Sequence, residues 1–281
     1  MPGESFERGL REAVFGVLEE GGTDPGGEEY PPVDYDSEIK HGFGGFIDIL
    51  RGELVNGKLG NRVLDFGSGI RQEDQIGRFL QKEAKRTKRK DVKVGLVDFR
   101  LSDKKENSGL FTLNLDMLAV GENGPEVARA VKSAVKLLGL EDLGEPPKDS
   151  AGFKEWLKGL KQIDTMIFSD LLNYVDYKQL LSLVYLFLKD NGRFFVFNRP
   201  NHGIKSLSSD RRLNSTEELM VFLEEELGMK LDSSSRFFHH PGEIAGDFVD
   251  RTDDLTEKRG GASYRDLVIA RKQEDFLLND K

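Results

Sequence analysis

The sequence predicts an α/β protein built on a doubly wound, mostly parallel sheet. From residue 61 onward, short apolar runs alternate with segments of helical periodicity, which is typical of a parallel sheet covered by helices on both faces. The first of these runs leads directly into a Gly-Ser-Gly turn. The last two are joined by a long charged loop without a helical pattern, so we expect a hairpin and an antiparallel strand at the end of the sheet.

Strands are predicted where apolar, β-branched and aromatic residues form short runs bounded by turn residues. These runs span residues 62–66, 93–98, 110–115, 163–169, 193–198, about 231–238 and 264–271. The segments between them show helical spacing, for example 127–138 and 178–189. Ser215 and Glu218 form a capping box that opens a further helix, and Gly228 closes it.

We expect residues 1–60 to form an N-terminal helical arm or cap, ahead of the main domain at 61–281. Apolar residues repeat at helical spacing over 5–20 and again over about 43–54, where Asn56-Gly57 ends the second helix. The stretch between these two helices is rich in glycine, proline and acids, which favours a linker. An unusually long third crossover at 118–160 is predicted to insert extra helices.

Composition and charge restrict the function. The chain has 281 residues, 37% of them hydrophobic and 32% charged, and a formal net charge of −9. This charge argues against generic nucleic-acid binding, and no apolar run is long enough for a membrane span. The N-terminus lacks the pattern of a signal peptide, and cysteine is absent, so a cytoplasmic location is expected. The basic run at 85–90 is interpreted as the solvated end of the helix after the glycine turn.

The most informative segment is 62–69, Arg-Val-Leu-Asp-Phe-Gly-Ser-Gly. It predicts a buried strand, a tight loop in which glycine lets the backbone approach a ligand, and a helix starting from that loop. The helix N-terminus would offer free N–H groups to a carboxylate or phosphate. Asp65 at the strand end suits a ligand with a cationic group better than it suits a pyrophosphate.

Acids also follow the next two predicted strands. Because ligands of open α/β sheets lie beyond the carboxyl ends of the strands, these acids should share one site. Asp98 could accept hydrogen bonds from both hydroxyls of a ribose, with Phe99 against the adenine face. Asp116 could accept the adenine amine while Met117 packs on the ring. The fourth strand ends in Ser169-Asp170-Leu171. The series predicts an adenosine-containing ligand.

These segments resemble the motifs of class I S-adenosylmethionine-dependent methyltransferases. The resemblance covers roughly residues 61–271 and rests on 63–69, 94–98, 116–117, 163–175 and 188–196. It implies a seven-stranded Rossmann-like sheet with the last strand inserted antiparallel, and in-line methyl transfer from S-adenosylmethionine. The residues it assigns to the cofactor are Asp65, Phe66, Gly67, Ser68, Gly69, Asp98, Phe99, Asp116, Met117, Ser169, Asp170 and Leu171.

The chain departs from the family pattern in three places, one of which is the long third crossover at 118–160. Arg71 stands where the loop usually carries a third glycine. The distance from Gly67 to Asp98 is longer than usual, which we attribute to a first helix extended by the basic run. No Asn-Pro-Pro-aromatic motif follows the fourth strand, which weighs against methylation of the amino groups of nucleic-acid bases.

The acceptor is expected to be a small molecule, and its identity and the oligomeric state are left open. Candidate general bases are His41, Tyr174 and His202. No metal site is predicted, because the adjacent His239 and His240 would face opposite sides of a strand.

Two alternative functions remain. One is a methyltransferase-like scaffold without catalysis. The other is an NAD(P) or flavin oxidoreductase, although Gln72 replaces the last glycine of that fingerprint.

Overall fold

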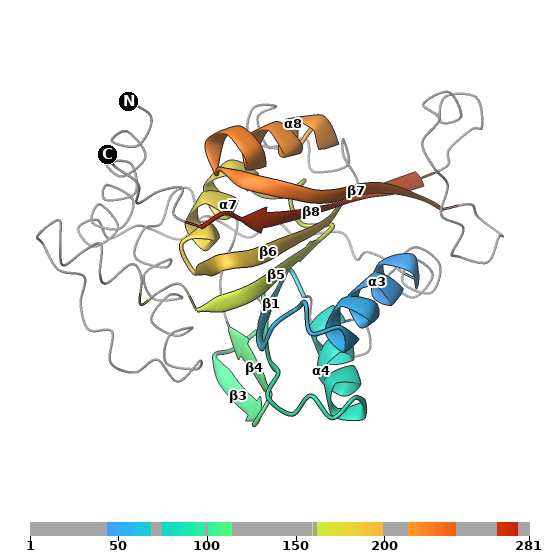
Figure 1. The fold of residues 1–281 in the computed structure, drawn as a ribbon, viewed down its shortest axis with the longest axis vertical. Coiled ribbons are helices and arrows are strands. Elements are labelled where there is room, and N and C mark those ends of the chain that lie inside the picture. The colour runs from blue at the N-terminus through green and yellow to red at the C-terminus, as the bar shows by residue number, and fades with distance from the viewer. Residues whose placement is uncertain are drawn as a thin grey trace, which may run out of the picture.

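A computed structural model describes residues 44–68, 75–98, 101–113, 159, 162–198, 213–239 and 263–274 of the chain. Within these residues, eight strands form one sheet in the order β3-β4-β2-β1-β5-β6-β8-β7 (Figure 1). Their bounds are β1 Arg62–Phe66, β2 Lys93–Val97, β3 Lys104–Asn107, β4 Leu110–Leu113, β5 Ile163–Ser169, β6 Leu188–Asn198, β7 Met229–His239 and β8 Ser263–Lys272. The helices predicted at 5–20 and 127–138 lie outside the described residues, as does the insertion predicted at 118–160 apart from residue 159.

The pairing of the strands confirms the predicted sheet. Strands β4, β2, β1, β5 and β6 are parallel neighbours. Strand β8 lies between β6 and β7 and is antiparallel to both, so the last strand is inserted into the sheet as expected.

The eighth strand, β3, was not predicted. It pairs antiparallel with β4 at the edge of the sheet, and its sequence, Lys-Lys-Glu-Asn, is mostly exposed and carries no apolar alternation. A tight turn connects β3 to β4, and in this turn Asn107 Oδ1 accepts the Gly109 N–H at 2.9 Å. Such a polar edge strand protects the sheet from further pairing.

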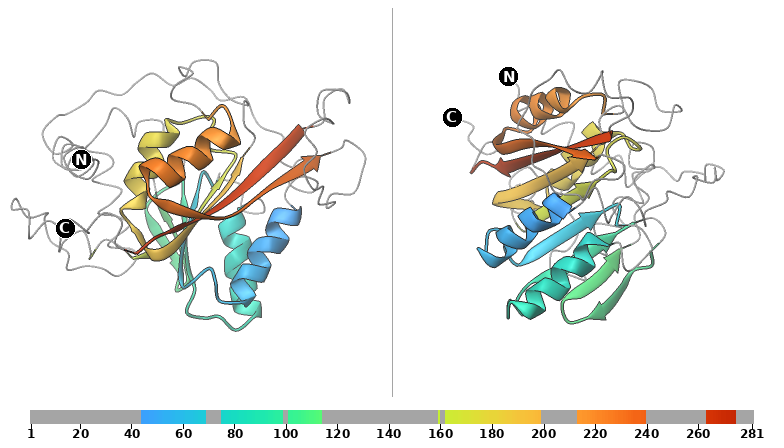
Figure 2. Two further views of the ribbon diagram at one scale, coloured as in Figure 1. Left: turned by 45° about the horizontal axis from the view of Figure 1, so that its top comes forward. Right: turned by 90° about the vertical axis from the view of Figure 1, so that its right-hand side faces the viewer.

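Helices cover both faces of the sheet. Helices α3 (Gly44–Val55) and α4 (Ile76–Arg86) lie side by side on one face, and α7 (Tyr177–Tyr185) and α8 (Thr216–Val221) cover the other (Figure 2). Because successive residues of a strand face opposite ways, β1 places Val63 in the core under α3 and α4 and Leu64 in the core under α7 and α8. Two apolar layers therefore hold the strand ends in place.

Two helix boundaries follow the predicted capping signals. Ser215 Oγ accepts the Glu218 N–H at 3.1 Å at the start of α8, which continues as a π-helical turn, η3 (Phe222–Glu226), up to Gly228 at φ +62°. Helix α3 ends where Asn56-Gly57 was expected to stop it, and Gly57 adopts φ +74°. Both predictions are confirmed.

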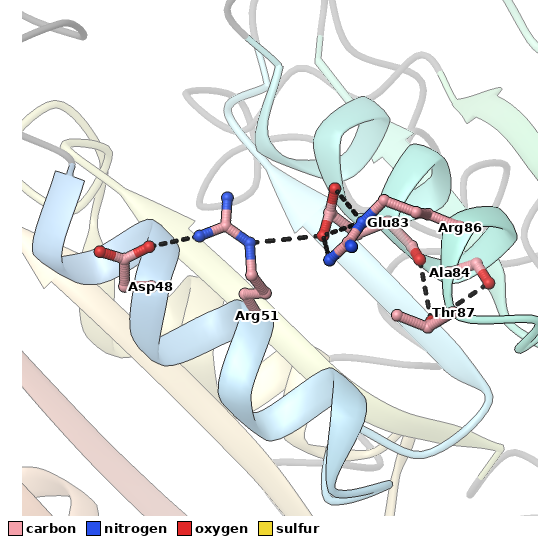
Figure 3. Close-up of polar contacts among 6 residues, drawn as sticks. All are labelled: Asp48, Arg51, Glu83, Ala84, Arg86 and Thr87. Carbon is pink, nitrogen blue, oxygen red and sulfur yellow. Dashed lines mark hydrogen bonds and ion pairs between the residues drawn. The ribbon is translucent and has the colours of Figure 1, made fainter.

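The basic run has a structural role. Helix α4 ends at Arg86 with Lys85 and Arg86 in its last turn, as the solvated-end interpretation predicted. Arg86 also donates to Glu83, which accepts from Arg51 of α3 at 3.3 Å and so joins the two helices (Figure 3). The hydrogen bond from Arg86 lowers the pKa of the Glu83 carboxyl.

A second residue of the basic run caps helix α3. Arg89 Nη1 donates to the Leu54 carbonyl at 3.0 Å, near the end of that helix.

No helix in the described part of the chain combines the length and the apolar character that crossing a membrane requires.

Candidate cofactor site at the carboxyl ends of β1, β2 and β5

The structure brings three of the four predicted strand ends together. Strand β1 lies between β2 and β5, so Asp65 to Ser68, Asp98 and Ser169 to Leu171 stand at neighbouring ends of one sheet edge. The weak catalytic candidate Tyr174 follows a few residues after β5 and is half-buried. The other predicted site residues lie outside the described residues, namely Gly69, Phe99, Asp116, Met117, His41 and His202.

The turn after β1 requires its glycine. Gly67 adopts φ +71°, and its N–H donates to the Val97 carbonyl at the end of β2 at 2.9 Å. A Cβ at this position would lie 3.3 Å from Leu171 Cδ1. The turn is therefore hydrogen-bonded to the end of β2 on one side and covered on the other by Leu171, which lies two residues after β5.

The carboxyl group of Asp65 is buried, with 1% of the residue exposed. Its Oδ2 accepts the Gly77 N–H at 2.9 Å, in the first turn of α4. The pKa of Asp65 is raised to about 7, mainly because burial disfavours the charged carboxylate; the hydrogen bond from Gly77 opposes this shift and the charge of Asp98 adds to it. Asp65 thus links the strand end to the helix and titrates close to neutral pH.

Gly77 lets α4 approach the sheet closely. A Cβ on this residue would lie 2.4 Å from Leu96 Cδ2 and 2.9 Å from Val94 Cγ1, so any side chain would push the helix away from β2. The glycine that allows this close packing is therefore residue 77, which lies well after the turn. The family pattern instead has its third glycine at the position that Arg71 occupies here. Sequence analysis missed Gly77 because it lies outside the expected motif spacing.

Two expectations about this helix were wrong. The helix was expected to start from the glycine turn, but α4 begins at Ile76. Its 11 residues end at Arg86, so the basic run does not lengthen it appreciably.

Asp98 directly follows β2 and is 2% exposed. Its N–H donates to the Leu113 carbonyl at 3.1 Å, and its carbonyl accepts the Leu101 N–H at 3.2 Å. The backbone on both sides of the acid is therefore fixed. Its charge acts on Asp65, as the pKa of the latter shows, so the two predicted acids are electrostatic neighbours.

Two buried hydroxyl groups at this edge have no hydrogen-bond partner. Among the described residues, three buried side-chain oxygens lack one, namely Ser68 Oγ, Ser169 Oγ and Tyr185 Oη. Ser68 follows β1 and Ser169 ends β5, so two of the three belong to the predicted site. A buried hydroxyl without a partner costs free energy, which a ligand that bonds to it would recover.

The aromatic residue of the motif belongs to the core. Phe66 stacks on Phe168 of β5 with ring centroids 5.0 Å apart and is almost fully buried. A contact between Phe66 and a cofactor would therefore be made through its backbone.

The end of β5 is held by two side-chain pairs. Asp170 Oδ2 accepts from Arg265 Nε of β8 at 2.8 Å. Asn198 Nδ2, at the end of β6, donates to Asn173 Oδ1 at 2.7 Å, and Asn198 Oδ1 accepts the Leu172 N–H at 3.2 Å. Sequence analysis did not identify Arg265. The charged pair Arg265-Asp266 directly before the apolar run 267–270 was the available signal.

Comparisons with known proteins find distant similarity only. No family model matches the chain, and no curated protein matches it. Solved structures with a similar fold include 1,6-didemethyltoxoflavin-N1-methyltransferase of Burkholderia thailandensis, with bound 1,6-didemethyltoxoflavin and S-adenosylhomocysteine, at 16% identity and a TM-score of 0.36 over 86% of each chain. A SAM-dependent methyltransferase from Archaeoglobus fulgidus has 18% identity and a TM-score of 0.40, over 85% of this chain and 99% of that one.

The sheet that the resemblance to class I methyltransferases implied is present, because it is mostly parallel and its last strand is inserted antiparallel. Because both TM-scores are below 0.5, the two structures assign no residue of this chain a role.

Proposed function

We propose that the chain is a methyltransferase that binds S-adenosylmethionine at the carboxyl ends of β1, β2 and β5 and methylates a small-molecule acceptor. The observation that carries this proposal is the composition of the sheet edge. Two buried acids, Asp65 and Asp98, meet there with the positive-φ turn at Gly67 and the unpartnered hydroxyls of Ser68 and Ser169.

The residues fit the two ends of such a cofactor. Asp98 would accept hydrogen bonds from the ribose hydroxyls, because a carboxylate at the end of the second strand is suited to a vicinal diol. The Gly67 turn would let the backbone approach the amino-acid end. The Ser68 and Ser169 hydroxyls would gain the partners that they lack. The proposal also includes the predicted contacts of Gly69, Phe99, Asp116 and Met117.

The main role of the protein in methyl transfer is to align the two reactants. When bound, S-adenosylmethionine supplies an electrophilic methyl group for in-line displacement by the acceptor. The protein orients the two reactants and excludes water, and a base is required only where the acceptor must lose a proton. His41, Tyr174 and His202 are the proposed candidates for that base. A cytoplasmic location is also part of the proposal, since the chain has no cysteine to form disulfides.

Ligand-dependent thermal stability tests the choice of cofactor. S-adenosylmethionine and S-adenosylhomocysteine at 100 times their dissociation constants should stabilise the protein by about 2.7 kcal/mol, which raises the melting temperature by about 5 °C or more. NAD at the same concentration serves as the comparison. A shift with NAD and none with either sulfur ligand would refute the proposal and favour an oxidoreductase.

A matched pair of variants tests the site. Asp98 directly follows β2, whereas the exposed Asp91 precedes the same strand at the opposite end of the sheet. Calorimetric titration with S-adenosylhomocysteine should show at least about tenfold weaker binding to Asp98→Asn, because a charge-assisted hydrogen bond is lost, and unchanged binding to Asp91→Asn. Equal affinities for the wild type and Asp98→Asn would move the ribose contact elsewhere.

Product formation distinguishes an enzyme from a scaffold. Release of S-adenosylhomocysteine from S-adenosylmethionine in the presence of a panel of small hydroxyl and amine acceptors supports catalysis. Absence of cofactor binding, together with a protein partner that co-purifies, would favour the scaffold.

A further inference from the structure

The ion pair between Arg265 and Asp170 connects strand β8 to the end of β5 across the intervening strand β6. Arg265 is 3% exposed, and its Nε donates to Asp170 Oδ2 at 2.8 Å. Its guanidinium carbon lies 6.0 Å from the ring centroid of Phe197, which belongs to β6. The arginine thus passes over the last apolar residue of β6 to reach a carboxylate of the predicted cofactor segment.

Asp170 has a backbone conformation that needs support. Its φ is +47°, which is unfavourable for a residue with a Cβ, and its N–H donates to the Phe197 carbonyl at 2.8 Å. Two other non-glycine residues in the described part of the chain have positive φ, Lys88 and Asn191, and neither lies at the cofactor edge. Backbone strain of this kind persists only where the surrounding contacts hold it. The ion pair with Arg265 is such a contact.

The two neighbours of Asp170 are both predicted cofactor residues. Ser169 ends β5, and its buried hydroxyl has no partner. Leu171 covers the Gly67 turn, with its Cδ1 within 3.3 Å of the position that a Cβ on Gly67 would occupy. A change in the φ of Asp170 would therefore turn the Ser169 hydroxyl and shift Leu171 at the same time.

We propose that Arg265 is a positioning residue for the cofactor site, which holds the left-handed turn at Asp170 and so fixes the Ser169 hydroxyl and the Leu171 side chain. It acts through Asp170, and no contact between Arg265 and the cofactor is needed. This inference rests on the proposed function, because the ligand whose binding reports the position of Ser169 and Leu171 is the proposed cofactor.

Strand β8 also takes part in a second arginine–carboxylate ion pair, which serves as a control for the loss of such a pair. The next residue, Asp266, accepts from Arg236 Nε at 2.7 Å and from Arg236 Nη2 at 2.9 Å. This second ion pair belongs to the same hairpin and is also largely buried. Asp266 also accepts from Thr216 of α8, so the second pair is directed to α8 and not to the end of β5.

The experiment is calorimetric titration of S-adenosylhomocysteine into the wild type, Arg265→Met and Arg236→Met, with melting temperatures recorded in parallel. Both substitutions should lower the melting temperature, because each leaves a carboxylate without its arginine. We expect Arg265→Met to bind the ligand at least about tenfold more weakly and Arg236→Met to bind it as the wild type does. Equal weakening in both variants would reduce Arg265 to a general stabilising role and overturn the inference.

Two double variants in the Arg265→Met background test the backbone conformation at Asp170 separately from the charge of its side chain. Glycine adopts positive φ without strain, whereas alanine does not. Arg265→Met/Asp170→Gly should therefore recover affinity relative to Arg265→Met/Asp170→Ala, although both double variants remove the carboxylate of Asp170. Because neither retains the carboxylate that faced Arg265, this comparison also serves if Arg265→Met alone fails to fold. Equal affinities of the two double variants would overturn the inference.

Binding of S-adenosylhomocysteine by the wild type distinguishes a failure of the proposed function from a failure of this inference. If the wild type does not bind S-adenosylhomocysteine, the proposed function fails and this inference fails with it. If the wild type binds and Arg265→Met binds equally well, only the role of Arg265 is overturned.

Discussion

The buried carboxyl group of Asp65 should make the stability of the protein depend on pH, and Asp65→Asn should remove that dependence. Asparagine has nearly the same shape and keeps an oxygen that can accept the Gly77 N–H, so packing and hydrogen bonding are preserved. The amide removes the charge and the titration. It also removes the repulsion by Asp98, which contributes to the raised pKa of Asp65.

The magnitude follows from the pKa in the folded and unfolded states. Burial raises the pKa of Asp65 from 3.8 to about 7, which corresponds to about 4 kcal/mol as an upper limit at about 1.4 kcal/mol per pH unit. Because the folded state holds the proton more tightly, this contribution to stability is complete below pH 3.8 and is lost as the pH rises through 7. Asp65→Asn should therefore match the wild type near pH 4 and be more stable near pH 8.

Urea unfolding of the wild type and Asp65→Asn at pH 5 and pH 8 measures this effect. The difference in the free energy of unfolding between the two proteins should be up to about 3 kcal/mol larger, in favour of the variant, at pH 8 than at pH 5, because about two pH units at about 1.4 kcal/mol each separate pH 5 from the pKa of Asp65. The exposed Asp91→Asn serves as a control for the removal of one negative charge and should change stability little at either pH. A difference between the wild type and Asp65→Asn that is the same at both pH values would refute the assignment of a buried, near-neutral carboxyl.

Three further substitutions test the packing and the site. Gly77→Ala should destabilise the protein by about 1–3 kcal/mol in urea unfolding, because its Cβ would lie 2.4 Å from Leu96 Cδ2, and an unchanged midpoint would contradict the close packing of α4. Ser169→Ala should leave the free protein as stable or more stable, since it removes an unpartnered buried hydroxyl, yet weaken S-adenosylhomocysteine binding in calorimetry; unchanged affinity would exclude Ser169 from the site. Arg89→Met should lower stability by about 1 kcal/mol through loss of the hydrogen bond to the Leu54 carbonyl, and Lys88→Met is its control.

Most strands were predictable because they are short apolar runs bounded by turn residues. A connection without a helix predicted the antiparallel hairpin at the end of the sheet, and the family resemblance implied the insertion of the last strand; the pairing of β8 agrees with both. The exposed edge strand β3 was missed because its stability comes from pairing with β4 and not from its own side chains. The start of α4 was misplaced because motif spacing was assumed to fix the helix, whereas the glycine needed for close packing is Gly77.

The site was predictable at the level of strand ends and not at the level of contacts. Asp65 and Asp98 do meet at one edge of the sheet, as the series of acids indicated. The hydrogen bond that the Gly77 N–H donates to Asp65 depends on where α4 begins, which the sequence does not encode locally. The pair Arg265–Asp170 joins residues 95 positions apart, and no periodicity or motif reports such a contact.

The inserted position of β8 has a consequence for how the protein is made. Residues 263–272 fill the space between β6 and β7, so those two strands cannot join one sheet before this segment has left the ribosome. Until then β6 presents an unpaired edge with apolar side chains such as Phe195 and Phe197, which invites aggregation. Non-local pairing of this kind also slows folding. A nascent chain that lacks β8 should therefore depend on chaperones, and synthesis arrested before residue 263 should yield insoluble protein.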